Sequence, residues 1–454
     1  MVLSPLMDEN RRVRRNIRLG SLGAALENYD FVVYLYVATL IGAAFFPSGT
    51  DTLRLAQTLA IYAIGFLIRP VAGVLIARVA DRVGRKRLFV INVMVMSAAT
   101  LVTGLLPTYA QVGWPAPILL MIMRVAQGCA VGGELPAAAV FVSEHAHRGG
   151  VAKAGAFQQA MTFVGLLFGA SAAFGSSLLA THLTPGTPSL AWRLPFIIGG
   201  VLGIVSVYLR RNLDESPAFQ QQSRQPRRTQ PRPVRDVLKN HGGAVLFGAL
   251  VVSGLAVANI AYITFWPTYL QVSVHLSATE ALAASLISVV GALVMMPFWG
   301  RVADRHGWRF VLLWAAGVTA TGTVLLLAVL PGLPRGSSIA LWIGLPAAVG
   351  AGAIISVVPG LVSSVFPAEV RQTGYSLSYN LVIAILGGLL TLAMVGLLSA
   401  LGSGAPMYVG FLACVITVLA AALVSKIPLY LGRGVEQAAS DTTGEVLAQE
   451  GKTP

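Results

Sequence analysis

Five ionisable side chains lie inside long apolar stretches of the sequence: Glu27, Asp30, Arg69, Arg124 and Glu134. All five belong to the first half of the chain, and the second half has no ionisable side chain deep in such a stretch except tyrosines. A charge in the centre of a membrane helix costs about 2.5–3.5 kcal/mol even on a lenient scale. Groups kept at that cost are candidates for chemistry, here the uptake of a proton by an acid and the binding of an anion by an arginine.

Spacing narrows these roles. Glu27 and Asp30 are three residues apart and share one helix face. At about 1.5 Å per residue, Asp30 lies roughly 17 Å along its stretch, and Arg124 about 12 Å along an oppositely directed one. Asp30 and Arg124 therefore lie at nearly the same depth, whereas Glu134 lies nearer the level of Glu27. We expect Asp30 to carry a proton, with Glu27 or Glu134 as alternatives.

A structural role stays open for each of these groups. Asp30 and Arg124 could form a static buried ion pair that fixes helix packing. Glu134 follows Gly132-Gly133 and could be a gating or helix-stabilising acid. Arg69 lies toward one end of its stretch, where it could cap carbonyls of a neighbouring loop or serve as a second substrate anchor.

The composition requires a membrane for these stretches. Of 454 residues, 56% are hydrophobic and only 11% are charged, and the mean hydropathy is +0.74. A soluble protein has about 25% charged residues. The net charge of +14 therefore does not indicate a nucleic-acid binder, which needs a wettable basic domain. Cys129 and Cys414 both lie in apolar runs, which excludes a disulfide framework or a zinc cluster.

Twelve stretches are long enough to cross a bilayer as helices. They lie near residues 19–46, 55–77, 88–107, 116–142, 155–181, 193–209, 243–270, 279–300, 310–331, 338–364, 374–400 and 406–428. Of the 32 Lys and Arg residues, 27 fall in the two tails and the alternate loops on one side. The positive-inside rule then predicts a multi-pass protein of the inner (cytoplasmic) membrane with both termini in the cytoplasm.

The chain contains an internal repeat. ARVADRVGRK at 77–86 and GRVADRHGWR at 300–309 agree at six of ten positions, and the same offset of 223 takes Arg148 to Arg371. We predict an all-α membrane protein whose twelve transmembrane helices form two pseudo-symmetric six-helix bundles. The expected parts are an N-tail (1–18), the first bundle (19–209), a linker rich in Arg, Gln and Pro (210–242), the second bundle (243–428) and a C-tail (429–454).

The repeated loop motif, a small residue followed by Asp-Arg and Gly at fixed spacing, resembles the signature of the major facilitator superfamily. Other stretches are similar to the metabolite:proton symporter family within it. They are Glu27-Asn28-Tyr29-Asp30-Phe31 with Tyr34, Arg69-Pro70 with Gly73, Arg124 with Gln127-Gly128, Gly132-Gly133-Glu134 with Glu144-His145, and Trp192-Arg193-Leu194-Pro195-Phe196 with Glu215-Ser216-Pro217. One departure is Asn28, where the family commonly has Trp.

The resemblance implies a proton-coupled symporter that imports a small, carboxylate-bearing metabolite by alternating access. A proton-coupled antiporter that exports drugs or metabolites is the alternative, and a channel or a membrane-embedded enzyme is less favoured. We expect no catalytic residues and no metal or other cofactor, the proton being the coupling ion. The expected partners are an organic anion or zwitterion and membrane lipid, with no nucleic acid, and the expected state is a monomer.

Two sets of residues complete the expected site. The substrate set comprises Arg124, Tyr34, Gln127 and Arg69 from the first half and Asn259, Tyr262, Tyr379 and Asn380 from the second. The gate set comprises Asp81, Arg82, Arg85, Asp304, Arg305 and Arg309, with Arg148 and Arg371. Tyr375 is a further substrate candidate, and Gln158 and Gln159 are weaker ones. A carboxylate at a helix end, paired with a neighbouring arginine, can hold a gate shut and break on opening.

Overall fold

A computed structural model describes residues 25, 28–47, 49–70, 72, 85–131, 134–144, 146, 149–180, 189–211, 234–329, 339–368 and 370–431. Within these ranges all regular secondary structure is helical. The helices of the first half are the segment Asn28–Tyr36, α2 (Ala38–Phe45), α3 (Asp51–Leu67), α5 (Arg85–Leu105), α6 (Tyr109–Val112), α7 (Pro115–Val131), α8 (Glu134–Glu144), α9 (Val151–Leu178) and α10 (Leu190–Arg211).

The second half begins with α12 (Val234–Asn259) and contains two π-helical segments. Its elements are α12, the π-helix η2 (Ile260–Thr264), α13 (Trp266–Ser273), α14 (Ala278–His306), α15 (Trp308–Val329), α16 (Ile339–Trp342), α17 (Leu345–Ser364), α18 (Arg371–Val382), the π-helix η4 (Ile383–Leu390), α19 (Thr391–Leu401), η5 (Gly402–Gly404), α20 (Ala405–Leu423) and η6 (Val424–Lys426). Each of the twelve predicted spans overlaps with one of these helices or with a consecutive set of them.

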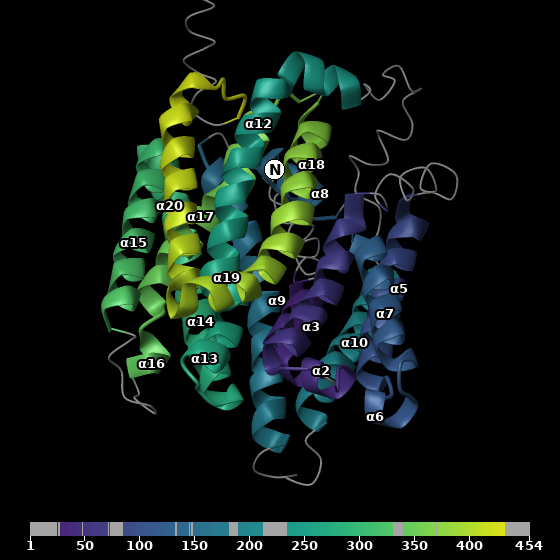
Figure 1. Ribbon diagram of the computed structural model, residues 1–454. Helices are drawn as coiled ribbons and strands as arrows, with labels where there is room; N and C mark the ends of the chain where they lie inside the picture. The colour runs from purple at the N-terminus through teal and green to yellow at the C-terminus, as the bar shows by residue number, and fades with distance from the viewer. Residues whose placement is uncertain are drawn as a thin grey trace, which may run out of the picture.

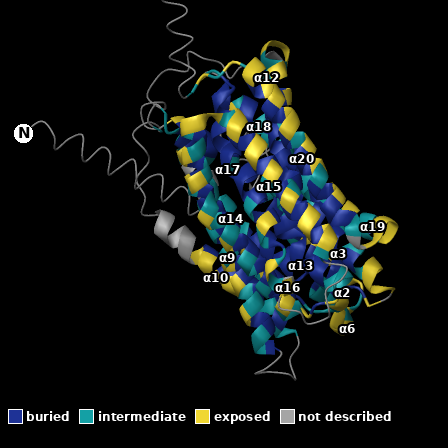
Figure 2. Cartoon of the chain, turned by 90° about the vertical axis from the view of Figure 1, so that its left-hand side faces the viewer, coloured by how far each residue is buried: buried dark blue, intermediate teal, exposed yellow. Residues whose placement is uncertain are grey.

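Seven helices in the described part of the chain are long and apolar enough to cross a membrane. An eighth span is the pair Asn28–Tyr36 and Ala38–Phe45, which is bent by 65°. Large apolar side chains such as Val294, Trp314 and Val415 are exposed on α14, α15 and α20. Figure 2 shows exposed residues along the outer sides of the helices and buried ones between them. Because soluble proteins bury most such side chains, these outer faces fit a lipid environment.

The end of the predicted linker contains helical structure. Helix α12 begins at Val234, within the predicted linker, and is kinked at His241, whose φ of −130° and ψ of 23° are not helical. Residues 212–233 lie outside the described part. Val237 is buried, so the first turns of α12 pack against the protein.

The glycine of the second loop motif has a conformational role. Gly307 has φ of 86° and separates α14 from α15. A residue with a side chain rarely adopts this left-handed conformation, so glycine allows the chain to reverse between the two helices. Its amide N–H is bonded to the carbonyl of Ala303, which closes the last turn of α14.

The two halves lie side by side, the first in purple to blue and the second in green to yellow, with α9 between them (Figure 1). At one end, the Thr39 hydroxyl donates to Gln271 Oε1 at 2.9 Å and joins α2 to α13. At the other end, Gly155 of α9 faces Gly360 of α17 so closely that a Cβ on Gly155 would lie 2.6 Å from the Gly360 nitrogen. The halves therefore touch at both ends, which are called the Gln271 end and the Gly360 end below.

Candidate functional site

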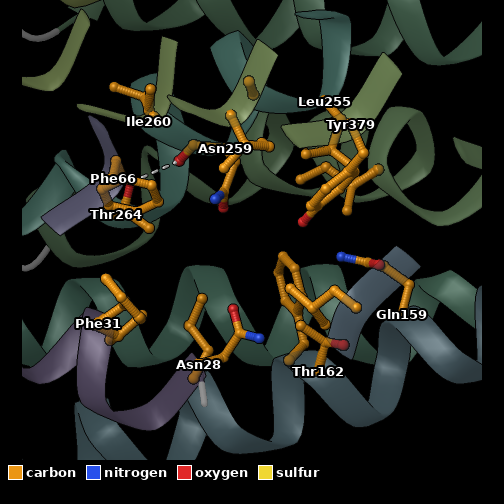
Figure 3. Close-up of a pocket in the computed structure, with 18 of the residues that line it drawn as sticks. Asn28, Phe31, Phe66, Gln159, Thr162, Leu255, Asn259, Ile260, Thr264 and Tyr379 are labelled. Carbon is orange, nitrogen blue, oxygen red and sulfur yellow. Dashed lines mark hydrogen bonds between the residues drawn. The ribbon is translucent and has the colours of Figure 1, made fainter. Parts of the chain in front are cut away.

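A pocket lies between the two halves, in the middle of the molecule. Its described lining from the first half is Asn28, Phe31, Val32, Tyr62, Phe66, Arg69, Leu135, Gln158, Gln159, Thr162, Phe163 and Leu166. From the second half it is Leu255, Ala256, Asn259, Ile260, Thr264, Ile355, Tyr375, Tyr379, Ile383, Gly387 and Thr391. Figure 3 shows side chains of both halves pointing toward one another across it. The lining is mainly aromatic and apolar with a few amides and hydroxyls, as in a small-molecule site.

Arg69 is the charged side chain among the described lining residues. Its Cζ lies 4.1 Å from the ring centre of Phe31 and 4.2 Å from that of Phe66. Two aromatic faces thus flank the guanidinium, which fixes its plane and compensates part of its desolvation. A guanidinium held in this way can bind a carboxylate with two parallel hydrogen bonds.

The second half contributes neutral polar groups to the pocket. Asn259 ends α12 just before η2, and its Oδ1 is buried without a hydrogen-bond partner. In the first half, Gln158 Oε1 on α9 is also buried without a hydrogen-bond partner. Tyr375 and Tyr379 lie one helical turn apart on α18, and their rings stack with centres 6.0 Å apart. Buried amide oxygens without partners are costly, so a ligand that donates hydrogen bonds to them would be stabilised.

Asp30 is buried behind this lining, with 4% of its surface exposed. The contact between its Oδ2 and Thr100 Oγ1 of α5 is 2.6 Å long. The Gln127 amide of α7 donates to the same Thr100 oxygen at 2.9 Å. Asp30 therefore ends a short polar chain that joins the first span to α5 and α7.

Arg124 does not form an ion pair with Asp30, contrary to our expectation from the sequence. Its guanidinium lies flat against the Tyr34 ring, with Cζ 3.7 Å from the ring centre, and Tyr62 is also near. All three of its side-chain nitrogens are buried without a hydrogen-bond partner. Asp30 is hydrogen-bonded to Thr100 instead, and the Arg124 guanidinium packs against the Tyr34 ring. The positive charge of Arg124 still acts electrostatically on Asp30.

At the Gly360 end, two carboxylates tie the halves together. Asp304 of α14 accepts the backbone N–H groups of Ala152 and Lys153, both at 2.9 Å. These amides are in the first turn of α9, where a carboxylate is favoured by the helix dipole. Glu144 at the end of α8 forms an ion pair with Arg371 of α18 at 2.6 Å, and Arg371 Nε donates to the Phe366 carbonyl.

Comparisons with known proteins decide the family. The sequence matches the Major Facilitator Superfamily over residues 31–388. The chain belongs to this superfamily. It is 32% identical to the glycine betaine/proline/ectoine/pipecolic acid transporter OusA of Dickeya dadantii (strain 3937), over 84% of this chain and 76% of that protein. It is 30% identical to the citrate-proton symporter of Salmonella typhi, over 81% of this chain and 83% of that protein.

Solved structures of the superfamily share the fold. The xylose transporter XylE from E. coli, in a partially occluded inward-open conformation, superposes with a TM-score of 0.67 at 16% identity. The match covers 92% of this chain and 98% of XylE. The predicted facilitator fold is therefore confirmed. The chain is a multi-pass membrane transporter and not an enzyme.

The structure of this transporter places only part of the predicted substrate set in the pocket. Arg69, Asn259 and Tyr379 line it, as do the further candidate Tyr375 and the weaker candidates Gln158 and Gln159. Five predicted residues do not belong to the lining: Arg124, Tyr34, Gln127, Tyr262 and Asn380. The first four lie outside the lining because their side chains contact residues of their own half.

Tyr34 donates to the Thr58 carbonyl and supports Arg124, and Tyr262 is hydrogen-bonded to Thr323. Gln127 contacts Thr100, as described above. Asn380 follows Tyr379 on α18 and is half-buried outside the lining. Glu27 lies outside the described residues, and Glu134 begins α8 but its side chain is not described.

Of the predicted gate set, Asp304 and Arg371 contact the opposite half of the transporter, whereas Arg305 and Arg309 are exposed. Asp81, Arg82 and Arg148 lie outside the described residues. Arg85 begins α5, but its side chain is not described.

Sequence reasoning missed several contributors to the site. Phe31, Tyr62 and Phe66 form the aromatic wall around Arg69, and Glu144 is the partner of Arg371. Glu144 could have been found as an acid at the end of a span, opposite a basic loop of the other half. Thr100 gives no signal in an apolar helix. No cluster of three or more metal-ligand side chains occurs in the part of the transporter that the structure describes.

Proposed function

We propose that this protein is a proton-coupled symporter that imports a small carboxylate-bearing organic anion or zwitterion. The observation that carries this is the pocket between the halves, in which Arg69 is the charged group among the described lining residues. A small anion can be held there by one guanidinium and oriented by neutral amides and hydroxyls. Both relatives named above act on carboxylate-bearing compounds, proline and betaine in one case and citrate in the other.

A zwitterion fits the pocket better than a tricarboxylate. Its carboxylate would bind Arg69, and its ammonium group would lie against the stacked Tyr375 and Tyr379 rings. Aromatic faces attract quaternary and primary ammonium groups, and more strongly when water is excluded. Three carboxylates would need more positive charge than the described lining supplies.

The proton site in this proposal is Asp30, with Glu27 and Glu134 as alternatives. Asp30 lies outside the pocket, but Asn28 and Phe31 on the same helix line it. A proton on Asp30 and a substrate against Asn28 and Phe31 therefore stabilise the same helix in one arrangement. A loaded, neutralised first half can then move relative to the second, which would give alternating access.

The Gly360 end corresponds to the cytoplasmic side in this proposal, because Lys153, Arg305 and Arg371 lie at helix ends there, as the positive-inside rule requires. The Glu144–Arg371 pair and the Asp304 contacts would close the cytoplasmic gate. Asp81, Arg82, Arg85 and Arg148 would complete it. The transporter would reside in the inner membrane as a monomer with both termini in the cytoplasm, and its two bundles (19–209 and 243–428) would be the moving bodies.

Transport by purified protein in liposomes tests the proposal. Radiolabelled glycine betaine, proline and citrate are offered outside, with the interior made alkaline. We expect a pH gradient to drive accumulation of one zwitterion above equilibrium and a protonophore to abolish it. Uptake that ignores the gradient would rule out proton coupling, and gradient-driven efflux from loaded liposomes would instead establish an antiporter.

A further inference from the structure

The Thr100 hydroxyl lies at the centre of a polar cluster within the first half. Thr100 is fully buried on α5. Its Oγ1 lies 2.6 Å from Asp30 Oδ2, 2.9 Å from the Met96 carbonyl oxygen and 2.9 Å from Gln127 Nε2. Three polar atoms on three different segments therefore share one hydroxyl.

Counting hydrogens limits this cluster to two arrangements. A hydroxyl has one hydrogen to donate and two lone pairs to accept with. The Thr100 hydrogen can therefore go either to the Met96 carbonyl, which can only accept, or to the Asp30 carboxyl. Ser97 and Thr103 on the same helix donate to the carbonyls four residues earlier in the same way, each at 2.7 Å.

When Thr100 donates to the Met96 carbonyl, the contact with Asp30 needs a hydrogen from the acid. Gln127 N–H fills one lone pair of Thr100 Oγ1, and a carboxylic O–H on Asp30 fills the other. In this arrangement each of the three contacts of Thr100 Oγ1 contains one hydrogen, and Asp30 is neutral, while Gln127 Oε1 stays buried without a partner.

We propose that Thr100 and Gln127 are positioning residues for the proton on Asp30. This inference rests on the proposed function, in which Asp30 is the proton site. When Asp30 is protonated, its O–H donates to Thr100 and the Thr100 O–H donates to Met96. When the proton leaves to water, the Thr100 O–H rotates from the Met96 carbonyl to the Asp30 carboxylate. One proton is released, and the hydroxyl hydrogen only changes its acceptor.

The surroundings of Asp30 allow this exchange without another acid among the described residues. Arg124 on α7 is the charged group that acts on Asp30 from a neighbouring helix, and Tyr29 is the titratable group beside it on its own helix. The Tyr29 hydroxyl donates to the Pro195 carbonyl and is not available to Asp30. Gly199 of α10 packs closely against both residues, since a Cβ there would lie 2.4 Å from Tyr29 Cε1 and 3.1 Å from Asp30 Oδ1.

Titration of the Asp30 carboxyl in the whole purified protein tests the proposal and needs no substrate. The C=O band of a protonated carboxyl is followed by infrared spectroscopy against pH, and Asp30→Asn identifies the band. A hydrogen bond to a carboxylate is stronger than one to a neutral acid. Thr100→Val should therefore raise the midpoint by about one pH unit.

Matched variants separate this role from packing. Thr103→Val removes an equally buried hydroxyl on the same helix and should leave the midpoint unchanged. Thr100→Ser keeps the hydroxyl and should titrate within about 0.3 pH units of the wild type. Gln127→Leu should shift the midpoint upward by less than Thr100→Val, because Thr100 loses only the donor that polarises it.

A Thr100→Val midpoint equal to that of the wild type would overturn the proposal, and so would an equal shift in Thr103→Val. If Thr100→Val does not fold, Gln127→Leu gives the test, and an unshifted midpoint there would contradict it. The result is independent of transport. A shifted midpoint combined with uptake that ignores the pH gradient would refute the symporter and leave the Thr100 role intact.

Discussion

In the described part of the first half of the transporter, three charged side chains are buried in the membrane-spanning part, whereas the described part of the second half buries only neutral polar groups there. The three are Asp30, Arg69 and Arg124. Arg371 is the buried charge of the second half, and it lies at the Gly360 end in the pair with Glu144. Two halves related by an internal repeat have therefore kept the same fold and divided the polar chemistry unequally.

The second half is specialised in another way. Its pocket-lining helices contain the π-helical segments η2 and η4, and Ile260, Thr264, Ile383 and Gly387 of these segments line the pocket. π-helical turns often occur at functional sites, where they let a helix change its local winding. The comparison suggests that the first half recognises charge, while the second half shapes the pocket. The following changes test this division.

Replacing Arg69 should have the largest effect on substrate affinity. Arg69→Gln removes the charge but keeps a polar side chain of similar length, and a charge-assisted pair is worth roughly 2–3 kcal/mol. We expect about a 30- to 100-fold weaker apparent affinity for the carboxylate substrate. Uptake kinetics in liposomes measure it. Arg69→Lys should recover part of the lost affinity. An unchanged affinity in Arg69→Gln would show that this pocket does not recognise its substrate by charge.

Disrupting the contact between the halves at the Gly360 end should have the second-largest effect. Gly155→Ala places a Cβ 2.6 Å from the Gly360 backbone nitrogen, so the gate cannot close as it does here. We expect about a 10-fold lower transport rate, corresponding to roughly 1.4 kcal/mol. Gly175→Ala on the same helix is the control, because nothing lies within 4 Å of its Cβ. Equal rates in the two variants would show that this contact does not limit transport.

Replacing neutral groups of the second half should weaken the affinity for substrate and leave the pH dependence of uptake unchanged. Asn259→Ala removes a buried amide that has an unpartnered oxygen. We expect about a 5-fold weaker affinity, typical of one neutral hydrogen bond of roughly 1 kcal/mol. The test is uptake as a function of external pH. A displaced pH profile would mean that the second half takes part in proton coupling and would break the comparison.

The ion pair between the halves should have the smallest effect. The Glu144 side chain is 39% exposed, and such pairs contribute about 0–1 kcal/mol. Glu144→Gln should therefore increase the population of molecules with an open gate about two- to five-fold. Maleimide labelling of Gln159→Cys, in a chain without Cys129 and Cys414, measures it. Asp51→Asn breaks the Arg54–Asp51 surface pair within one helix and should change nothing. An unchanged labelling rate in Glu144→Gln would exclude this pair from the gate.

The sequence was sufficient for the spans and the repeat, because about 20 apolar residues in a helix are dictated by the bilayer itself. It also located Asp30, Arg69 and Arg124 as buried charges, because ionisable side chains are rare in such apolar stretches. The bend at Val37 and the π-helical segments could not be foreseen, since they depend on contacts between helices.

The rotation of each helix about its own axis was the main unknown. In a soluble helix the apolar stripe shows which face is buried, but a membrane helix is apolar on both faces. Arg69 therefore turned out to face the pocket, and Arg124 to lie behind Phe31 and Tyr34. The same ambiguity hid Thr100, whose importance depends on which helices surround Asp30.

The most direct test of the account is proton-driven uptake by Asp30→Asn in liposomes, compared with substrate exchange at equal pH on both sides. Asparagine cannot carry the proton, so accumulation driven by the pH gradient should be lost. Exchange does not require net proton release and should persist. Uptake by Asp30→Asn that remains as dependent on the gradient as in the wild type would contradict the assignment of Asp30 as the proton site.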